Sequence, residues 1–233
     1  MIEVLKGLKP LFNGHFIDIG VNIGQTLIKV HAVYGKVKYV GFEPNPSCVH
    51  YVNELMKINQ LEGYEIFPLG VGAKTEVLKL NFFSADKSDS SASVIEHYRP
   101  DHVEDHFIYV PVFDIRLVQH FLPLEQHSIV KIDVEGAELD VLLGLSEWIE
   151  EFAPIIILEI LPIYTTGNTS RLNRQLRIEG LFRSVGYKMA RIRKGGKVRL
   201  ELIDEIGIHS SLENCDYLVF PGCLEKNLLG CFN

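Results

Sequence analysis

The first 45 residues of the chain alternate between short apolar segments and segments of turn or helical character. Residues 16–19 form an apolar segment, a glycine-containing turn follows, and residues 24–34 have the composition of a helix. A second apolar segment, 38–42, leads directly to the acidic Glu43. The order strand, turn, helix, strand predicts the start of a parallel sheet whose strands are linked by helices.

The turn after the first predicted strand has the pattern D-x-G-x-N-x-G, formed by Asp18, Gly20, Asn22 and Gly24. Glycine lacks a Cβ atom, so the backbone of such a turn can approach a ligand closely. At the end of the second strand, the carboxylate of Glu43 can accept hydrogen bonds from both hydroxyls of a ribose. Together the turn and the acid predict a pocket for a nucleoside.

The spacing in the turn also distinguishes between nucleoside ligands. A dinucleotide-binding turn has the pattern G-x-G-x-x-G and places a pyrophosphate at the N-terminus of the helix. Here Asp18 would oppose a pyrophosphate, because two anions would share one desolvated site. An acid in this place suits S-adenosylmethionine, which has a cationic amino-acid tail and a positively charged sulfonium. We therefore expect Glu43 to hold the ribose, and Asn45 to face the adenosine together with the backbone near Phe42.

Length and composition are typical of one soluble α/β domain spanning residues 1–233. The 233 residues are 47% hydrophobic and 23% charged, and they carry a formal net charge of −7. Such a charge argues against a nucleic-acid partner, since no broad basic surface is implied. The basic cluster at 191–199 is interpreted as an exposed hairpin tip.

Cysteine usage and the lack of targeting signals predict a cytoplasmic protein. The four cysteines are scattered without a C-x-x-C pair, which is typical of a reducing compartment. No signal peptide is predicted near the N-terminus. The longest apolar stretch, 153–163, contains Glu159 and two prolines and is too short to cross a bilayer, so no membrane partner is expected.

Predicted strands and helices continue to alternate after residue 45, which favours a mostly parallel sheet covered on both faces. Strands are predicted at 64–71, 76–83, 108–112, 128–133 and 154–160, and closing antiparallel strands at 187–193, 200–204 and 216–220. Helices are predicted at 46–59, 113–122, 136–145 and 171–185. The backbone at Gly70 and Val71, near the end of the third strand, is the expected neighbour of the adenine ring.

The segment 84–105 differs from the rest because it is polar, rich in serine and without periodicity. A loop of this length inside a compact domain is usually functional or disordered. We predict that it forms a lid on the acceptor side, where closure would exclude water from the reacting centre. Ser90, Ser91 and Ser93 are its candidates for hydrogen bonds to an acceptor.

Two acids, Asp133 and Glu135, lie at and just beyond the end of the predicted strand 128–133. Ligands of such sheets bind at the carboxyl ends of the strands, where these acids would emerge. Residues two apart on an extended backbone point the same way, so both carboxylates are expected to face the site. Glu159, at the end of the next strand, could converge with them. Glu138 is expected instead to favour the N-terminus of the following helix.

The run K-I-D-V-E-G-A-E at 131–138, taken with the turn at 18–24 and the run E-P-N-P at 43–46, resembles the FkbM-type methyltransferase family. The similarity extends from about residue 16 to about residue 160. The resemblance implies a three-layer Rossmann-like methyltransferase fold, with a mostly parallel seven-stranded sheet and an antiparallel edge strand. It also implies S-adenosylmethionine as the methyl donor, and usually a hydroxyl acceptor on a sugar or another small metabolite.

Methyl transfer to a hydroxyl requires that the reactants be positioned and that a proton be removed. Two routes to the deprotonation remain open. In one, a side chain acts as the base, and the candidates are Asp133, Glu135, Glu159, His97, His102 and His106. In the other, the three acids hold a hard cation such as Mg²⁺, which polarises the acceptor oxygen.

The predicted site therefore has a catalytic part and a cofactor-binding part. The catalytic residues are Asp133, Glu135 and Glu159, and the cofactor-binding residues are Asp18, Gly20, Asn22, Gly24, Glu43, Asn45, Gly70, Val71 and Asp133. The expected partner is a small-molecule or glycan acceptor, and homo-oligomer formation is left open. Two rival functions remain: a dinucleotide-dependent oxidoreductase, which the turn disfavours, and a cofactor-binding protein without transferase activity.

Overall fold

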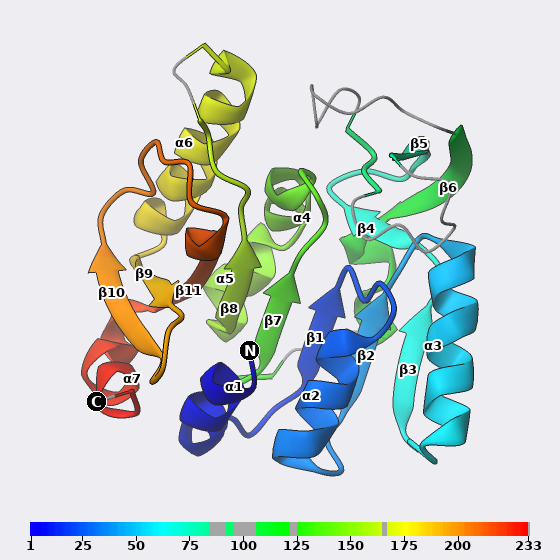
Figure 1. Cartoon of the computed structure of the whole chain (residues 1–233), viewed down its shortest axis with the longest axis horizontal. Coiled ribbons are helices and arrows are strands. Elements are labelled where there is room, and N and C mark those ends of the chain that lie inside the picture. The colour runs from blue at the N-terminus through cyan, green and yellow to red at the C-terminus, as the bar shows by residue number, and fades with distance from the viewer. Residues whose placement is uncertain (84–91, 96–105, 122–124, 165–166, 233) are drawn as a thin grey trace.

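An eight-stranded sheet forms the centre of the computed structural model, which describes residues 1–83, 92–95, 106–121, 125–164 and 167–232 (Figure 1). Its strands, in spatial order, are β10 (Arg199–Ile203), β9 (Tyr187–Arg193), β11 (Asp216–Pro221), β8 (Ile155–Glu159), β7 (Ile129–Ile132), β1 (Phe16–Ile19), β2 (Tyr39–Phe42) and β3 (Tyr64–Phe67). Strands β8, β7, β1, β2 and β3 run parallel to one another. Their carboxyl ends therefore meet at one edge of the sheet.

The predicted fold class is confirmed, but the sheet differs from the expected one in two details. Among the described residues it has eight strands instead of seven, and the antiparallel strand β11 lies between β8 and β9 rather than at the edge. The edge strand β10 is also antiparallel to its neighbour β9. A short turn at 194–198 joins these two strands, and so short a connection permits only an antiparallel pair.

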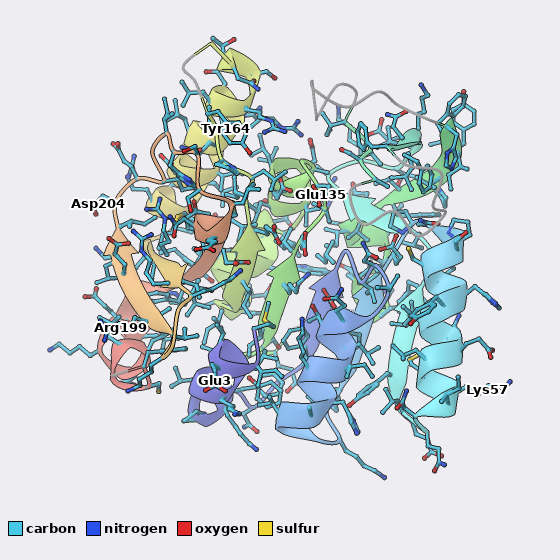
Figure 2. All side chains as sticks on the ribbon, in the orientation of Figure 1. Glu3, Lys57, Glu135, Tyr164, Arg199 and Asp204 are labelled. Atoms are coloured by element: carbon cyan, nitrogen blue, oxygen red, sulfur yellow. The ribbon has the colours of Figure 1, made fainter. Side chains whose placement is uncertain are left out.

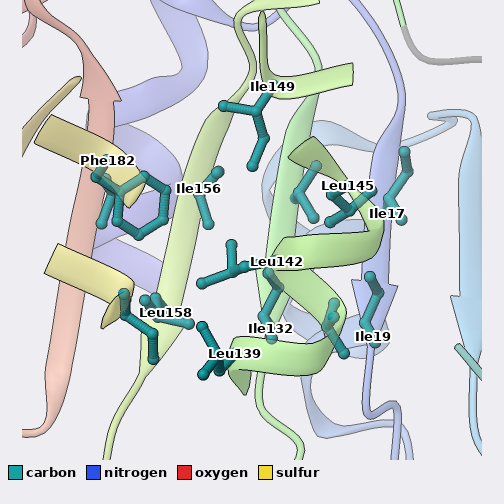
Figure 3. Close-up of a cluster of buried hydrophobic side chains, with 14 of the residues drawn as sticks. Ile17, Ile19, Ile132, Leu139, Leu142, Leu145, Ile149, Ile156, Leu158 and Phe182 are labelled. Atoms are coloured by element: carbon teal, nitrogen blue, oxygen red, sulfur yellow. The ribbon is translucent and has the colours of Figure 1, made fainter. Parts of the chain in front are cut away.

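Helices cover both faces of the sheet. One face carries α1 (Ile2–Leu8), α2 (Gln25–Tyr34), α3 (Pro46–Ile58) and α7 (Glu225–Gly230), and the other carries α4 (Glu138–Gly144), α5 (Ser146–Phe152) and α6 (Thr169–Ser184). Figure 3 shows leucine and isoleucine side chains of α4 and α5 packed against β1, β7 and β8. Because side chains alternate along a strand, Ile17 and Ile19 face this layer, whereas Phe16 packs on the opposite side.

A second, three-stranded sheet stands above β3 and has the order β4 (Gly70–Gly72), β6 (His106–Asp114), β5 (Glu76–Phe82) (Figure 1). The prediction of one strand over 64–71 is therefore wrong, since β3 ends at Phe67 and β4 belongs to the other sheet. Pro68 follows Phe67 and lacks the N–H group that a continuing strand would need.

The predicted helix at 113–122 is also wrong. Strand β6 extends to Asp114, and two short 3₁₀ helices follow, η2 (Ile115–Leu117) and η3 (Gln119–Phe121). The Asp114 side chain accepts a hydrogen bond from the backbone N–H of Arg116 at 3.0 Å, which favours this tight turn at the strand end. The remaining 3₁₀ segments are η1 (Lys9–Leu11), η4 (Leu212–Asn214) and η5 (Gly222–Leu224).

Most of the predicted lid lies outside the described residues, which include only 92–95 of the segment 84–105. The same holds for Ser90, Ser91, His97 and His102. Within the described part of the chain, no helix is long and apolar enough to cross a membrane.

Candidate active site

A cavity of about 750 Å³ opens at the carboxyl ends of β1, β2, β7 and β8. Its walls come from the turn between β1 and α2, the end of β2, the turn between β7 and α4, and the three-stranded sheet. Figure 2 places Glu135 at this edge, between α4 and the small sheet. The cavity therefore lies where the sequence predicted the ligand site.

Gly20 is required by the packing of two strand ends. It has φ +91°, and a Cβ atom here would lie 1.8 Å from the carbonyl oxygen of Asp133. Gly24 (φ +81°) directly precedes α2, and a Cβ atom would lie 3.0 Å from the Leu55 side chain. Glycine at both positions thus permits a positive φ angle and the close approach of neighbouring protein atoms. The predicted close approach of a ligand to this turn stays a prediction, and Gly20 does border the cavity.

Glu43 is held by backbone N–H groups on both sides. Its Oε2 accepts from the Asn22 N–H at 2.8 Å, and its Oε1 accepts from the Asn45 N–H at 2.8 Å. Burial raises the pKa of Glu43 to about 7, although these two hydrogen bonds act in the opposite direction. The carboxyl group borders the cavity, and each oxygen keeps a second lone pair for another donor.

Three other predicted cofactor-binding residues border the same cavity near Glu43: Asn45, Gly70 and Val71. The Asn45 side chain accepts a hydrogen bond from the Ser47 N–H at 3.0 Å and thereby caps α3. Gly70 and Val71 present β4 of the small sheet to the cavity. These residues enclose the end of the cavity that β2 defines.

Asp18 and Gly24, in contrast, are absent from the described residues that border the cavity. The Asp18 side chain has no solvent exposure, and the Tyr39 hydroxyl donates a hydrogen bond to its Oδ2 at 2.5 Å. Its Oδ1 lies 3.4 Å from the ammonium nitrogen of Lys131. Asp18 can therefore reach a ligand in the cavity only through the field of its charge or through Lys131.

Lys131 is the central cation of the site, although it was not among the site residues predicted from the sequence. Its side chain is 8% exposed, and its Nζ lies 3.0 Å from Oδ2 of Asp133 in addition to its contact with Asp18. Burial alone would lower the pKa of Lys131, but the two carboxylates outweigh burial and raise that pKa. The ammonium group therefore stays charged. A lysine inside an otherwise apolar strand was the available signal.

Asp133 and Glu135 both border the cavity, but the argument from an extended strand is wrong. Strand β7 ends at Ile132, and Glu135 lies in a turn with φ +49°, a conformation that is uncommon for a residue with a side chain of this size. The Ser93 hydroxyl donates to the carbonyl oxygen of Glu135 at 2.6 Å. Since Ser93 is fully buried, it positions this turn, and its expected contact with an acceptor is not what the structure shows.

Glu159 ends β8 and borders the same cavity. Burial raises its pKa to about 8, and the negative charges of Asp133, Asp216 and Glu135 contribute to the increase. Asp133 is paired with Lys131, whereas no described lysine or arginine forms an ion pair with Glu159. The raised pKa suits a group that takes up a proton near neutral pH.

Glu138 lies at the first turn of α4, as expected, and is buried. Its Oε1 accepts a hydrogen bond from the Gly136 N–H at 2.7 Å. Burial raises the pKa of Glu138 to about 7. The side chain borders only a small void that it shares with Asp133, Glu135 and Glu159, so it lies behind the cavity wall.

The remaining walls contain residues that no motif marked. Apolar side chains line the side formed by β5 and the segment 92–95, namely Leu78, Leu80, Ala92, Val94 and Ile95. On the opposite side, Lys194 and Asp216 form an ion pair beside Glu159. Asp216 is the register partner of Glu159 across β11 and β8, a pairing that only the tertiary fold defines.

A metal site receives no support from the structure. The described residues contain no group of three or more His, Cys, Asp or Glu side chains arranged to hold a metal ion. Of the three loop histidines, only His106 is described, and its ring stacks on Phe82 with centroids 4.5 Å apart. The described residues therefore do not support the Mg²⁺ alternative.

The parallel strand order, the cavity at the carboxyl ends and the acid at the end of β2 define a Rossmann-like α/β fold with a candidate ligand site at the edge of its sheet. The family model of the methyltransferase FkbM domain matches residues 18–189. The chain therefore belongs to the methyltransferase FkbM family.

Two curated relatives are similar to this chain over much of its length. "Methyltransferase 1" of Beauveria bassiana is 27% identical over 163 residues, which cover 63% of this chain and 64% of that protein. "Methyltransferase sdnD" of Sordaria araneosa is 24% identical over 205 residues, which cover 78% and 76%. The chain thus aligns with slightly less than two thirds of the Beauveria protein.

Solved structures show the same fold. The methyltransferase FkbM from Methylobacillus flagellatus has a TM-score of 0.53 and 15% identity, covering 89% of this chain and 43% of that chain. An O-methyltransferase from Bacillus cereus, determined in complex with SAH, has a TM-score of 0.53 and 10% identity, covering 94% and 80%. At these identities the likeness concerns the fold alone.

Proposed function

We propose that this protein transfers the methyl group of S-adenosylmethionine to a hydroxyl group of a small-molecule or glycan acceptor. One observation carries the proposal: Glu43, held by two backbone N–H groups, faces the same cavity as Asp133, Glu135 and Glu159. A ribose-binding acid at one end and a group of acids at the other suit a nucleoside with a cationic tail. Membership of the methyltransferase FkbM family supports this donor.

In the proposed complex, the two ribose hydroxyls donate to the free lone pairs of Glu43. Gly70 and Val71 flank the adenine, and Asn45 closes the same end of the cavity. The turn with Gly20 and Asn22 lies under the ribose and the methionine part, whose positive charge is directed toward Asp133. Asp18 and Gly24 act on the cofactor through the shape and charge of the turn, since neither borders the cavity.

The proposed chemistry is an in-line displacement at the methyl carbon. The acceptor oxygen forms a bond to this carbon while the bond from carbon to sulfur breaks and its electron pair remains on sulfur. The hydroxyl proton passes to the carboxylate of Glu159, a base whose pKa of about 8 suits this task. Asp133, paired with Lys131, and Glu135 orient the reactants in this scheme.

The walls of the cavity also support an acceptor with an apolar body. Leu78, Leu80 and Val94 form an apolar side opposite the acids. A hydroxyl group directed to Glu159 and an apolar part against β5 would satisfy both sides. The formal net charge of −7 and the acidic site disfavour a nucleic-acid acceptor.

Calorimetry with S-adenosylmethionine, S-adenosylhomocysteine and NAD tests the donor. Binding of the first two and no binding of NAD is the expected result, while binding of NAD alone would replace the proposal with the dinucleotide-dependent alternative. Transfer of a labelled methyl group to a panel of hydroxylated acceptors then tests the reaction. Cofactor binding without transfer to any hydroxylated, aminated or thiol acceptor would indicate a non-catalytic cofactor-binding protein.

A further inference from the structure

Three charged side chains lie in direct contact in and directly behind the wall of the cavity. Lys131 lies between Asp18, at 3.4 Å, and Asp133, at 3.0 Å. Asp18 and Lys131 are register partners on the adjacent parallel strands β1 and β7, so their side chains project from the same face of the sheet. The three groups together carry a net charge of −1 when all are ionised.

Asp18 differs from the other two because it is sealed from the cavity. It has no exposed surface, and the Tyr39 hydroxyl covers one of its oxygens. Lys131 and Asp133 do border the cavity. A substitution at Asp18 can therefore change the charge of the site without removing a side chain that touches the ligand.

Such a charge acts differently on the methyl donor and on its product. The sulfonium of S-adenosylmethionine is positive, whereas the sulfur of S-adenosylhomocysteine is neutral, and the rest of the two molecules is the same. A negative charge nearby therefore favours the donor over the product. In a partly buried site the interaction is stronger than in water because the effective dielectric constant is lower.

We propose that Asp18 and Lys131 set the ratio of the affinities of the site for S-adenosylmethionine and S-adenosylhomocysteine through the net charge of −1 that they and Asp133 together leave beneath the sulfur. The inference rests on the proposed function, since it requires that both ligands bind in this cavity. Asp18 and Lys131 are then residues that determine specificity, and Asp18 does so without touching the ligand. Loss of the positive charge during transfer weakens the hold on the product and assists its release.

Dissociation constants of both ligands, measured by calorimetry at mildly alkaline pH, test the proposal. Asp18→Asn makes the group of charges beneath the sulfur more positive by one charge. We expect the affinity for the donor, divided by the affinity for the product, to fall by about 5- to 20-fold. The double variant Asp18→Asn/Lys131→Met restores the wild-type net charge, and its ratio should return to within about threefold of wild type. The matched control Tyr39→Phe removes the hydrogen bond to Asp18 without changing any charge and should leave the ratio unchanged.

Each outcome decides a different point. If the wild type binds neither ligand, the proposed function fails. If both bind but Asp18→Asn keeps the wild-type ratio, or the double variant behaves like Asp18→Asn, the charge argument is overturned. Circular dichroism and thermal unfolding show whether each variant is folded. If Asp18→Asn does not fold, Lys131→Met is compared with the double variant, because these two also differ by one charge. The ratio of donor affinity to product affinity should be higher for Lys131→Met. An equal ratio would contradict the proposal.

Discussion

The two ends of the cavity hold carboxylates in different ways. At the end of β2, Glu43 is bound by the backbone N–H groups of Asn22 and Asn45 and forms no ion pair with a described cation. At the ends of β1 and β7, Asp18 and Asp133 share the ammonium group of Lys131. Glu43, Asp18 and Lys131 are buried and Asp133 is partly exposed, and both arrangements lie at the same edge of one parallel sheet.

The groups that contact a carboxylate at this edge of the sheet determine whether its oxygens remain available to accept further hydrogen bonds. Backbone donors occupy one lone pair of each Glu43 oxygen and leave the others open, so this acid is suited to binding neutral hydroxyl groups. The single ammonium group of Lys131 offsets only one of the two negative charges of Asp18 and Asp133, so this end of the cavity keeps a net charge of −1 when all three groups are ionised. Glu159 belongs to neither arrangement, and its raised pKa suits proton transfer.

The largest expected effect comes from Glu159→Gln, which removes the proposed base and keeps the size of the side chain. The rate of methyl transfer should fall by about 10²- to 10⁴-fold, because a positioned base contributes a factor of that size. Single-turnover kinetics and calorimetry separate this loss from cofactor binding, which should change little. Asp140→Asn, at an exposed carboxylate on the cavity rim, is the control. A change in rate below threefold for Glu159→Gln would assign the base to another residue.

Glu43→Ala tests the other end of the cavity. Loss of the hydrogen bonds between the ribose and a charged acceptor should weaken S-adenosylmethionine binding by about 1–3 kcal/mol. Equilibrium dialysis or calorimetry measures this change. An unchanged dissociation constant would remove Glu43 from the site and would end the distinction between a binding end and a reacting end.

The pH dependence of cofactor binding sharpens the same distinction. Burial places the pKa of free Glu43 at about 7, and the ionised form is the one that accepts both ribose hydroxyls. Binding should therefore weaken as the pH falls below about 7, by at most about tenfold per unit, since one proton must be released. Glu43→Gln should abolish this dependence. A wild-type affinity that stays constant between about pH 5 and pH 7 would contradict the assignment.

Glu138→Gln has the smallest expected effect and concerns stability. The folded-state pKa is about 7, above the ordinary value of 4.5, so the folded protein binds this proton more tightly than the unfolded chain does. Its contribution to stability therefore falls as the pH rises from 4.5 through 7 and stays low above that range. The free energy of unfolding of the variant should exceed that of the wild type by about 1 kcal/mol at alkaline pH. Near pH 4.5 the two proteins should be equally stable, and urea unfolding at both pH values measures the difference. An equal effect at both values would mean that the proton is not involved.

Much of the fold could be predicted because its signals are local. The apolar segments 16–19 and 38–42 became β1 and β2 within one residue, and α3 was predicted to within one residue at its end. The glycine turn and the acid after β2 depend on backbone conformation and side-chain chemistry at neighbouring positions. Nine of the eleven predicted site residues border the cavity, and they were predicted from the turn, from this acid and from positions at the ends of strands.

Two of the errors arose where distant segments decide the structure. Residues 64–71 form strands in two different sheets, a division that follows from β6, some 40 residues later in the chain. Likewise, β11 lies between β8 and β9 because of long-range pairing that no local pattern records. Propensity describes a residue's own conformation, whereas strand partners are selected by packing.

The sequence by itself determined that this chain forms a parallel sheet with a nucleoside-binding edge, because periodicity, glycine turns and a terminal acid are properties of adjacent residues. Only the tertiary structure decided that Asp18 is sealed behind Lys131 while Glu43 faces the cavity. That outcome depends on the register of β1 against β7, which brings Asp18 and Lys131 side by side although 113 residues separate them in the chain. Register is set by the packing of whole sheet faces. The different positions of Asp18 and Glu43 relative to the cavity therefore appear only once the strands are assembled.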